Sequence, residues 1–344
     1  MFKLVKNKGL KALNNLRTKS IILFGFSTWK HDFIQKMLNR PCIFITTQDS
    51  NNDDFMKVFI KNLNFIEDIY VWSYNEPFWL NSVCTNANLN FYRVEDGFIR
   101  SKGLGLDKSI PKSLIFDNSG YLYFDSIRQS NLHMLIRNTD LSIYNLERTK
   151  GIIQTLVKYN LSKYNIINKV RNIYYQDAIL VIGQNEKDIS IHKSGALFTT
   201  NEALLDYVIK SNPNREIIYK PHPDTIKNPK TRLSYPENLK GILVIDDLNH
   251  LFNNISCISE VHTISSLLGF EFLLRGIKTY CYSRTWYSGW GLTEDTYMSK
   301  DLNLKKTIEE IFYCAYILYP TYYSYTYEHS SVEKIMTELL RDSE

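Results

Sequence analysis

The sequence predicts an α/β protein of two domains, each built on a parallel β-sheet. Two observations support this fold class. The chain has 344 residues, more than the roughly 150 that a single domain usually holds. Short apolar runs also alternate with helical stretches in the first half of the chain, and they do so again after residue 170. We expect an N-terminal Rossmann-like domain over 1–170, with a helical segment at 127–170, and a C-terminal Rossmann-like domain over 171–344.

Four apolar runs are expected to form the parallel strands of the first domain. Each is short, rich in β-branched or aromatic residues, and bounded by Gly, Pro, Asn or Asp. They are residues 20–26, 42–46, 68–72 and 89–94. Two further runs, 114–116 and 121–124, flank the turn sequence Asp117–Gly120. We expect them to pair as a β-hairpin.

Helical spacing dominates the middle of the chain before the strand pattern returns. Ile152, Ile153, Leu156, Val157 and Leu161 repeat at helical spacing within 127–170. The strands expected after this segment are 178–182, 216–219, 242–245, 255–258 and 278–281. The helices expected between and after them are 204–209, 265–274, 305–318 and 331–341, the last two free to pack back on the domains.

Composition excludes several classes of function. The 41 Lys and Arg against 36 Asp and Glu give a net charge of +5, which suits an anionic substrate and is too small to indicate a nucleic-acid partner. The five cysteines form no CxxC pair, so neither a disulfide framework nor a thiolate metal site is expected. No His, Asp or Glu cluster has metal-ligand spacing either. We therefore expect a cytoplasmic protein that needs no metal.

The N-terminus is basic and supports two interpretations. Lysines precede a short apolar run, but no cleavage site follows and no stretch is long enough to span a bilayer. Residues 2–17 can form a basic helix that lies on an anionic bilayer, as a peripheral contact at the cytoplasmic face of the inner membrane. They can equally form a tail that packs on its own domain.

The first candidate site directly follows the strand predicted at 89–94. Glu95 and Asp96 are adjacent carboxylates, and each raises the pKa of the other, which suits a general base. Gly97 allows close backbone approach to a ligand. Arg100 can clamp a carboxylate or phosphate through two nitrogens. The alternative is an acidic turn with a surface ion pair.

Two more candidates follow strands of the second domain. Gly183 and Gln184 lead into Asp188, which is either a nucleophile or base or simply an acidic residue at a helix start. Lys220 and His222 follow the strand at 216–219, with His222 held between two prolines. A rigid His beside a Lys can bind a phosphate or protonate a leaving group.

The fourth candidate is the stretch from Glu260 to Ser266. Thr263, Ser265 and Ser266 are expected at the start of the helix 265–274, where free N–H groups favour a phosphate. The alternative is ordinary N-capping. Glu260 can accept hydrogen bonds from a ribose or a base. The aromatic loop 284–293 that follows either covers a sugar or base or acts as a hydrophobic plug.

Taken in order, these clusters resemble the bacterial capsule-polysaccharide synthesis (KpsC-like) transferases, the retaining β-Kdo transferases of the capsule linker and related O-antigen enzymes. The matching segments are EDGFIRSKGLG (95–105), LSKYN (161–165), GQNEKDISI (183–191), YKPHPD (219–224), EVHTISSLLGFEFLLRG (260–276) and WYSGWGLT (286–293). Two α/β domains joined by helices are also the outline of GT-B glycosyltransferases. Periplasmic binding proteins and two-domain epimerases share that outline, so it assigns no function alone.

The resemblance implies a GT-B-like fold and CMP-Kdo as donor, with no metal. It implies a double displacement in which Asp188 is the nucleophile and Glu95 or Asp96 activates the hydroxyl of an oligosaccharide or glycolipid acceptor. His222 also counts among the catalytic residues. The residues expected to bind the donor are Arg100, Gln184, Lys220, His222, Glu260, His262, Thr263, Ser265 and Ser266.

Two alternatives remain open at the sequence level. One is an inverting CMP-sugar transferase of the sialyl type, with Asp96 as base. The other is a non-catalytic glycan-binding assembly protein on the same fold. The acceptor sugar, the linkage and the oligomeric state do not follow from the sequence.

Overall fold

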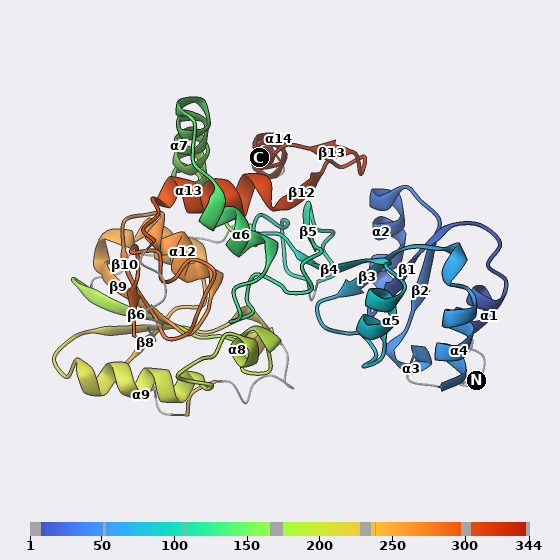
Figure 1. Cartoon of the computed structure of the whole chain (residues 1–344). Helices are drawn as coiled ribbons and strands as arrows, with labels where there is room; N and C mark the ends of the chain where they lie inside the picture. The colour runs from blue at the N-terminus through green and yellow to red at the C-terminus, as the bar shows by residue number, and fades with distance from the viewer. Residues whose placement is uncertain are drawn as a thin grey trace. The chain divides into compact units, whose positions relative to one another are not determined.

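The computed structural model describes residues 8–50, 53–105, 107–165, 175–227, 235–237, 239–296 and 304–341. The chain divides into two compact units (Figure 1). The first unit comprises Met1–Leu122 and Tyr319–Ile335, and the second comprises Tyr123–Leu318 and Met336–Glu344. The boundary expected from the sequence is residue 170. The difference arises because the helices α6 (Asn131–Asn138) and α7 (Ile143–Lys158) pack on the end of the second unit's chain, α7 against α13 (Ile308–Phe312) and α6 against the turn 313–318.

The first unit is built on one mixed sheet. In the described residues its strand order is β13-β12-β5-β4-β3-β1-β2, with β1 to β4 parallel and β5, β12 and β13 antiparallel to their neighbours. The strands are β1 Ser20–Phe24, β2 Cys42–Ile45, β3 Ile66–Trp72, β4 Asn90–Asp96, β5 Ser113–Asp117, β12 Pro320–Tyr323 and β13 His329–Ser330. The helices are α1 Lys8–Asn14, α2 His31–Leu38, α3 Thr47–Ser50, α4 Asp53–Lys61 and α5 Leu80–Asn86, with short 3₁₀ turns at Thr28–Lys30 and Leu63–Phe65.

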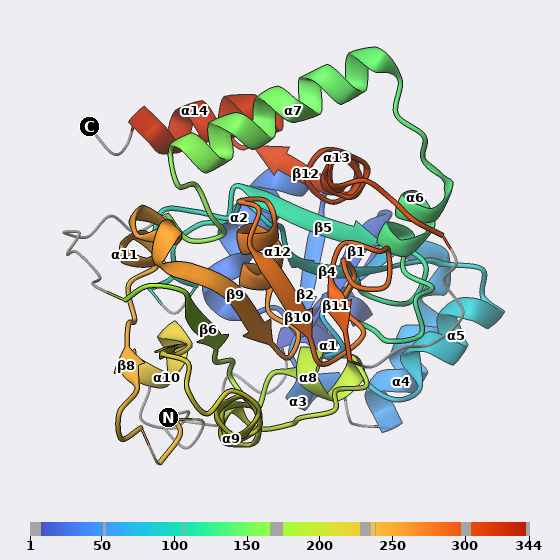
Figure 2. The same cartoon turned by 90° about the vertical axis from the view of Figure 1, so that its left-hand side faces the viewer.

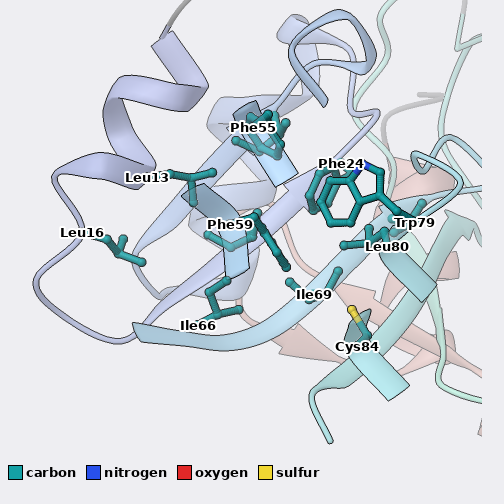
Figure 3. Packing of buried hydrophobic residues seen from close by; sticks show 13 residues of the cluster. Leu13, Leu16, Phe24, Phe55, Phe59, Ile66, Ile69, Trp79, Leu80 and Cys84 are labelled. Carbon is teal, nitrogen blue, oxygen red and sulfur yellow. The ribbon is translucent and has the colours of Figure 1, made fainter. Parts of the chain in front are cut away.

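A hydrophobic core covers one face of this sheet, and α1 belongs to it. Leu13 of α1 and Leu16, two residues after its end, are buried with Phe24, Phe59 and Ile69 (Figure 3). The described part of the basic N-terminal segment therefore packs on its own unit. Residues 1–7, with Lys3 and Lys6, lie outside the described residues. Membrane contact by this segment stays a prediction.

The β-hairpin expected at 114–124 is wrong. β5 pairs with β4 on one side and with β12 on the other. The turn sequence is used differently, because Asp117 accepts hydrogen bonds from the backbone N–H and the hydroxyl of Ser119, and from the hydroxyl of Tyr319. The outer neighbour of β5 thus comes from the far end of the chain. A local turn signal carries no information about such a partner.

The second unit holds a parallel sheet with helices on both faces. In the described residues its order is β11-β10-β9-β6-β7-β8, and β9, β10 and β11 lie side by side in Figure 2. α12 packs on one face and α9 on the other (Figure 1). The strands are β6 Ala178–Ile182, β7 Ile217–Lys220, β8 Leu243–Val244, β9 Ile258–Thr263, β10 Lys278–Cys281 and β11 Glu294–Asp295.

The helices of this part of the chain are mostly short. They are α6 Asn131–Asn138, α7 Ile143–Lys158, α8 Ile189–Lys193, α9 Asn201–Ser211, α10 Pro223–Lys227, α11 Leu248–Asn253, α12 Leu267–Leu273 and α13 Ile308–Phe312, then a π-helical turn Tyr313–Leu318 and finally α14 Val332–Arg341. No helix among the described residues is long and apolar enough to cross a membrane.

One predicted strand of this unit is out of position. The apolar run 255–258 was expected to form it, but Ile255–Cys257 is a 3₁₀ turn and the strand is β9, Ile258–Thr263. Polar residues at 259, 260 and 262 hid this strand from a search for apolar runs. Glu260 and His262 are tolerated there because they pair with each other, Nε2 of His262 lying 3.5 Å from Oε1 of Glu260. The loop at the carboxyl end of β9 therefore begins only at Ile264.

Candidate functional site

The carboxyl ends of β6, β7 and β9 meet at one edge of the second unit's sheet. Ile182 at the end of β6 lies opposite Lys220 of β7 and Thr263 of β9. The N–H of Gly183 donates to the carbonyl of Lys220 at 2.8 Å. The three segments that leave these strands carry most of the residues singled out in the sequence. In parallel α/β sheets this edge is where ligands bind.

Gln184 ties the end of β6 to the start of α12. Its side chain is buried. Its Oε1 accepts the N–H of Ser265 at 2.7 Å, and its Nε2 donates to the Ser265 hydroxyl at 2.9 Å. Asn201 holds the Gln184 backbone from the other side, accepting its N–H and donating to its carbonyl. The side chain of Gln184 therefore links the end of β6 to the start of α12 and fixes the position of Ser265.

The start of α12 presents two hydroxyl groups that retain a hydrogen to donate. Ser266 is the N-cap, and its Oγ accepts the N–H of Leu268 at 3.3 Å. The N–H of Ser266 is itself capped by the hydroxyl of Thr263 at 3.1 Å. The hydroxyls of Ser265 and Ser266 each act as acceptors in these bonds and are half-buried. Both N-capping and anion binding are therefore open to this segment.

The aromatic loop after β10 supports this helix start from behind. Trp286, Tyr287 and Trp290 are all buried. The Tyr287 hydroxyl donates to the carbonyl of Ser266 at 2.6 Å. A Cβ on Gly269 would lie 2.4 Å from that hydroxyl, so only glycine allows this contact. Of the two interpretations of the loop, the structure favours the hydrophobic plug.

Lys220 is the last residue of β7, and His222 follows it two residues later. Lys220 is only 3% exposed, and burial lowers the pKa of its ammonium to about 8, against the opposing effect of Asp246, Asp247 and Glu271. Burial also holds the pKa of His222 below its usual range. His222 Nδ1 accepts the N–H of Asp224 at 3.2 Å, so a neutral ring carries its proton on Nε2. That nitrogen remains as a donor for a ligand.

Asp188 lies near this pair, at the start of α8. Its Oδ1 accepts the N–H of Ser190 at 2.9 Å, which makes it the N-cap of the helix. The residue is exposed, and its negative charge acts to raise the pKa of His222. The capping role expected as the alternative is therefore real. It uses one carboxylate oxygen and leaves Oδ2 for other chemistry.

Glu260 and His262 lie apart from these residues along β9. They occupy the third and fifth positions of the strand, paired with each other. His262 stacks on Tyr280 at 4.4 Å between ring centroids, and its Nδ1 lies 2.8 Å from the Tyr282 hydroxyl. Burial lowers the pKa of His262, with Glu260 opposing. The structure surrounds His262 with protein groups rather than directing it to the edge of the sheet.

The carboxylate pair of the first unit is held by a buried arginine. Arg100 is fully buried, and its Nε donates to Asp96 Oδ2 at 2.7 Å while its Nη1 donates to the Ser101 hydroxyl. The sequence predicts that Arg100 clamps a ligand, but in the structure its guanidinium is engaged inside the protein. Glu95, the other carboxylate of the pair, is half-buried. Its Oε1 accepts the N–H of Asp96. A Cβ on Gly97 would lie 2.2 Å from the Ser113 hydroxyl, so the turn requires glycine.

One charged residue near the sheet edge was not singled out by sequence reasoning. Glu271 of α12 is 1% exposed and accepts hydrogen bonds from the Ser162 hydroxyl and the Lys163 N–H. Glu271 lies in the segment 260–276, in which the sequence analysis named only residues up to Ser266. The signal for Glu271 is a charged residue among the apolar residues of the helix predicted at 265–274.

The second unit's site thus combines cationic, hydroxyl and carboxylate groups. Lys220 and His222 can hold an anion, the hydroxyls of Ser265 and Ser266 can donate to it, and Asp188 supplies a carboxylate. Within the described ranges, no three His, Cys, Asp or Glu side chains gather as metal ligands would. The arrangement suits chemistry on a molecule that carries a phosphate or carboxylate.

Comparison with known proteins assigns the family. The family described as "Capsule polysaccharide biosynthesis protein" matches residues 127–327, which include the whole of this sheet edge. The chain belongs to that family. The lipopolysaccharide-processing protein LpsZ of Rhizobium meliloti is 34% identical over 313 residues, 88% of this chain and 70% of LpsZ. The capsule polysaccharide modification protein LipA of Neisseria meningitidis serogroup B is 31% identical over 83% of this chain, which spans only 40% of LipA.

Solved structures confirm the predicted GT-B-like α/β fold. The β Kdo 2,7 transferase of Thermosulfurimonas dismutans KpsC matches with a TM-score of 0.71 and 29% identity over 95% of this chain and all of that one. The β Kdo 2,4 transferase of the same protein matches with a TM-score of 0.78 and 24% identity, covering 94% and 98% of the two chains. Membership of the capsule-polysaccharide family and the fold class are therefore both established.

Proposed function

We propose that this chain is a retaining β-Kdo transferase, which moves Kdo from CMP-Kdo to a glycan or glycolipid acceptor in capsule or O-antigen synthesis. The observation that carries the proposal is the edge of the second unit's sheet, where a carboxylate, the Lys220 ammonium, the His222 imidazole and two hydroxyls gather. The similarity to the two KpsC transferases supports the same substrate class.

In this proposal the donor binds through its two anionic groups. Lys220 and the Nε2–H of His222 interact with the phosphate of CMP or the carboxylate of Kdo. The hydroxyls of Ser265 and Ser266 donate to the phosphate, with Gln184 and Thr263 fixing their positions. We no longer propose direct donor contacts for Arg100 and His262, because both are enclosed by protein groups. Glu260 stays a prediction for the cytidine.

The transfer then takes place in two displacements. Asp188 Oδ2 attacks the anomeric carbon of Kdo, the bond from that carbon to the phosphate oxygen breaks, and CMP leaves with the electron pair. The acceptor hydroxyl next attacks the same carbon, its proton passes to a base, and the bond to Asp188 breaks. Two inversions give net retention. Charge on the departing phosphate is balanced by Lys220, and the neutral His222 ring donates a hydrogen bond from Nε2, so we propose no metal.

The base that activates the acceptor hydroxyl is proposed to be Glu95 or Asp96. Asp96 is committed to Arg100 at 2.7 Å, so a proton on Asp96 would weaken a buried ion pair. Glu95 is half-buried, and its Oε1 accepts the N–H of Asp96. We propose that one of these two carboxylates is the base. The inverting sialyl-type alternative, with Asp96 as base, stays a prediction.

The test of this function is the substitution Asp188→Ala. Transfer from CMP-Kdo is expected to fall to about one thousandth of the wild-type rate or less, because the attacking group is lost, while CMP still binds. Intact-mass spectrometry of the wild type with donor alone is expected to show a Kdo adduct, absent from the variant. Thr200→Ala is the matched control, since it removes an N-cap from α9 in the same unit.

The alternatives predict different results. An active Asp188→Ala enzyme would contradict the nucleophile assignment. An inverted anomeric product, read by NMR, would indicate single displacement. A protein that binds CMP but neither hydrolyses nor transfers the donor would be a non-catalytic assembly protein.

The location at the cytoplasmic face of the inner membrane is proposed from the acceptor class, and vesicle binding of the full chain tests it.

A further inference from the structure

Three strands of the first unit meet at the edge of the sheet that carries the proposed base. β4 ends at Asp96, β5 begins at Ser113, and β12 ends at Tyr323. Leu114 of β5 lies opposite Asp96 on one side and opposite Thr321 of β12 on the other. Neighbouring strands lie about 4.8 Å apart, so β12 runs about 10 Å from β4. The far end of the chain therefore contributes to the surroundings of the proposed base.

A tight turn follows β12 and presents the side chain of Tyr325. The N–H of Ser324 donates to the carbonyl of Glu328 at 2.9 Å, and the N–H of Tyr327 donates to the carbonyl of Ser324 at 3.0 Å. The hydroxyls of Ser324 and Thr326 lie 2.8 Å apart, and that of Thr326 donates to the Glu328 carboxylate at 3.1 Å. These bonds fix the backbone at the tip of the turn, where Tyr325 is 51% exposed.

Lys112 covers one face of the Tyr325 ring. Its Nζ lies 3.1 Å from the ring centroid. The residue is only 7% exposed, although a lysine usually extends its ammonium group into water. Its carbonyl accepts the N–H of Tyr323 at 2.8 Å, and its N–H donates to the carbonyl of Arg100, whose guanidinium binds Asp96. Attraction between the buried ammonium and the ring holds the ring in one orientation.

An exposed aromatic side chain is not by itself a binding site, because isolated apolar residues are common on protein surfaces. Tyr144, which is 77% exposed at the start of α7, is an example. Tyr325 differs because a buried cation fixes its ring and because it follows a strand that lies two places from the proposed base. A ring that is already fixed loses little entropy when a ligand packs on it. A sugar ring offers such a surface its C–H face and keeps its hydroxyls in water.

We propose that the Tyr325 ring is the platform of an acceptor subsite in the first unit. It packs against a pyranose residue of the acceptor, next to the residue whose hydroxyl is activated by Glu95 or Asp96. The distance of about 10 Å between β4 and β12 exceeds the width of one sugar ring, so the acceptor has at least two sugar residues. The proposal rests on the function proposed above, because that function brings the acceptor to these carboxylates.

The kinetic test is the substitution Tyr325→Ala, made at an exposed position where the fold tolerates it. The KM for a disaccharide acceptor is expected to rise about tenfold, because the aromatic contact is lost, and the KM for the matching monosaccharide much less. The kcat with the disaccharide is expected to stay near the wild-type value. Tyr325→Phe keeps the ring and is expected to restore the wild-type KM.

Tyr144→Ala is the matched control, since it removes another exposed tyrosine ring from the surface. It is expected to change neither constant. An unchanged disaccharide KM in Tyr325→Ala would overturn the subsite. An equal rise of KM for the monosaccharide and the disaccharide would also overturn it, because the ring would then contact the reacting residue itself.

Binding measured without donor separates this subsite from the proposed function. The probes are the methyl glycosides of Kdo, glucose and galactose and a disaccharide of each. NMR of tyrosine-labelled protein follows the Tyr325 ring signals, which are assigned by their loss in Tyr325→Phe. At least one disaccharide is expected to shift these signals more than its monosaccharide does. If no disaccharide shifts them, the subsite is wrong even in an enzyme that transfers Kdo. A shift in a protein that transfers no Kdo would support the subsite and contradict the proposed function.

Discussion

At the scale of single residues, Gly183 decides whether the sheet edge keeps its shape. A Cβ at this position would lie 2.2 Å from the hydroxyl oxygen of Tyr219 and 2.8 Å from the ring carbon that bears it. Tyr219 is buried, so its ring cannot swing into solvent. Gly183→Ala is therefore expected to destabilise the protein by about 1–3 kcal/mol, the usual cost of overpacking. Chemical denaturation measures the change.

A second substitution tests that mechanism. Tyr219→Phe removes the atom closest to the added Cβ, so the double variant is expected to recover part of the stability lost by Gly183→Ala. The ring carbon remains too close, which limits the recovery. Gly151→Ala is the matched control, because nothing lies within 4 Å of a Cβ there and an alanine favours its helix, α7. A double variant as unstable as Gly183→Ala would contradict the steric explanation.

At the scale of elements, the side chain of Gln184 joins the end of β6 to the start of α12, where the donor is proposed to bind. Gln184→Glu keeps the side-chain shape and can still accept the Ser265 N–H, but it adds a negative charge at the helix start. We expect at least about a tenfold loss of CMP affinity, the effect of one unfavourable contact of about 1.4 kcal/mol, with the loss shrinking at high salt. Calorimetric titration with CMP at two ionic strengths measures it.

Gln184→Ala provides the contrast for this prediction. It leaves the buried N–H of Ser265 without its acceptor, which typically costs about 1–3 kcal/mol of stability. Its loss of CMP affinity is expected to be insensitive to salt, because no charge is added. Equal salt dependence in the two variants would show that Gln184 acts only by fixing the position of Ser265.

Elements with a strong local signal were predicted well. The strands at 178–182 and 278–281 match β6 and β10, because each is a short run bounded by turn residues. β9 was misplaced because Ser259, Glu260 and His262 interrupt its apolar pattern, while its position is set by pairing with β6 and β10. β12 was missed because a partner for β5 two hundred residues away in the sequence leaves no local trace. Local patterns of apolar residues therefore cannot predict strands that pair with distant segments or that contain buried polar residues.

At the scale of the whole molecule, the first unit is formed from both ends of the chain. Tyr322 and Tyr323 of β12 are buried in that unit, with Tyr323 in the same core as Ile21 and Leu114. The order of motifs along the sequence identified the residues of the sheet edge, since strand ends in a parallel sheet converge. It could not identify Arg100 as an internal counter-ion of Asp96, because that role depends on complete burial.

The pH dependence of stability follows from two buried groups in the second unit. Glu271 has its pKa raised from 4.5 to about 7, so between these values the folded protein holds a proton that the unfolded chain releases. Stability therefore falls as pH rises from about 4.5 to 7. Lys220 has its pKa lowered from 10.5 to about 8, so the unfolded chain binds the extra proton. Stability rises again between about pH 8 and 10.5.

Each arm of this profile has its own test. One pKa unit corresponds to about 1.4 kcal/mol, so each arm, which spans about 2.5 units, changes the stability by at most about 3.5 kcal/mol. Glu271→Gln is expected to remove the fall below pH 7 and keep the rise above pH 8, whereas Lys220→Met is expected to keep the fall and remove the rise. Urea denaturation of both variants and the wild type, from pH 5 to 10, measures the slopes. Because the two groups share one buried network, a variant that flattened both arms would show that they titrate as a single coupled pair rather than as separate sites.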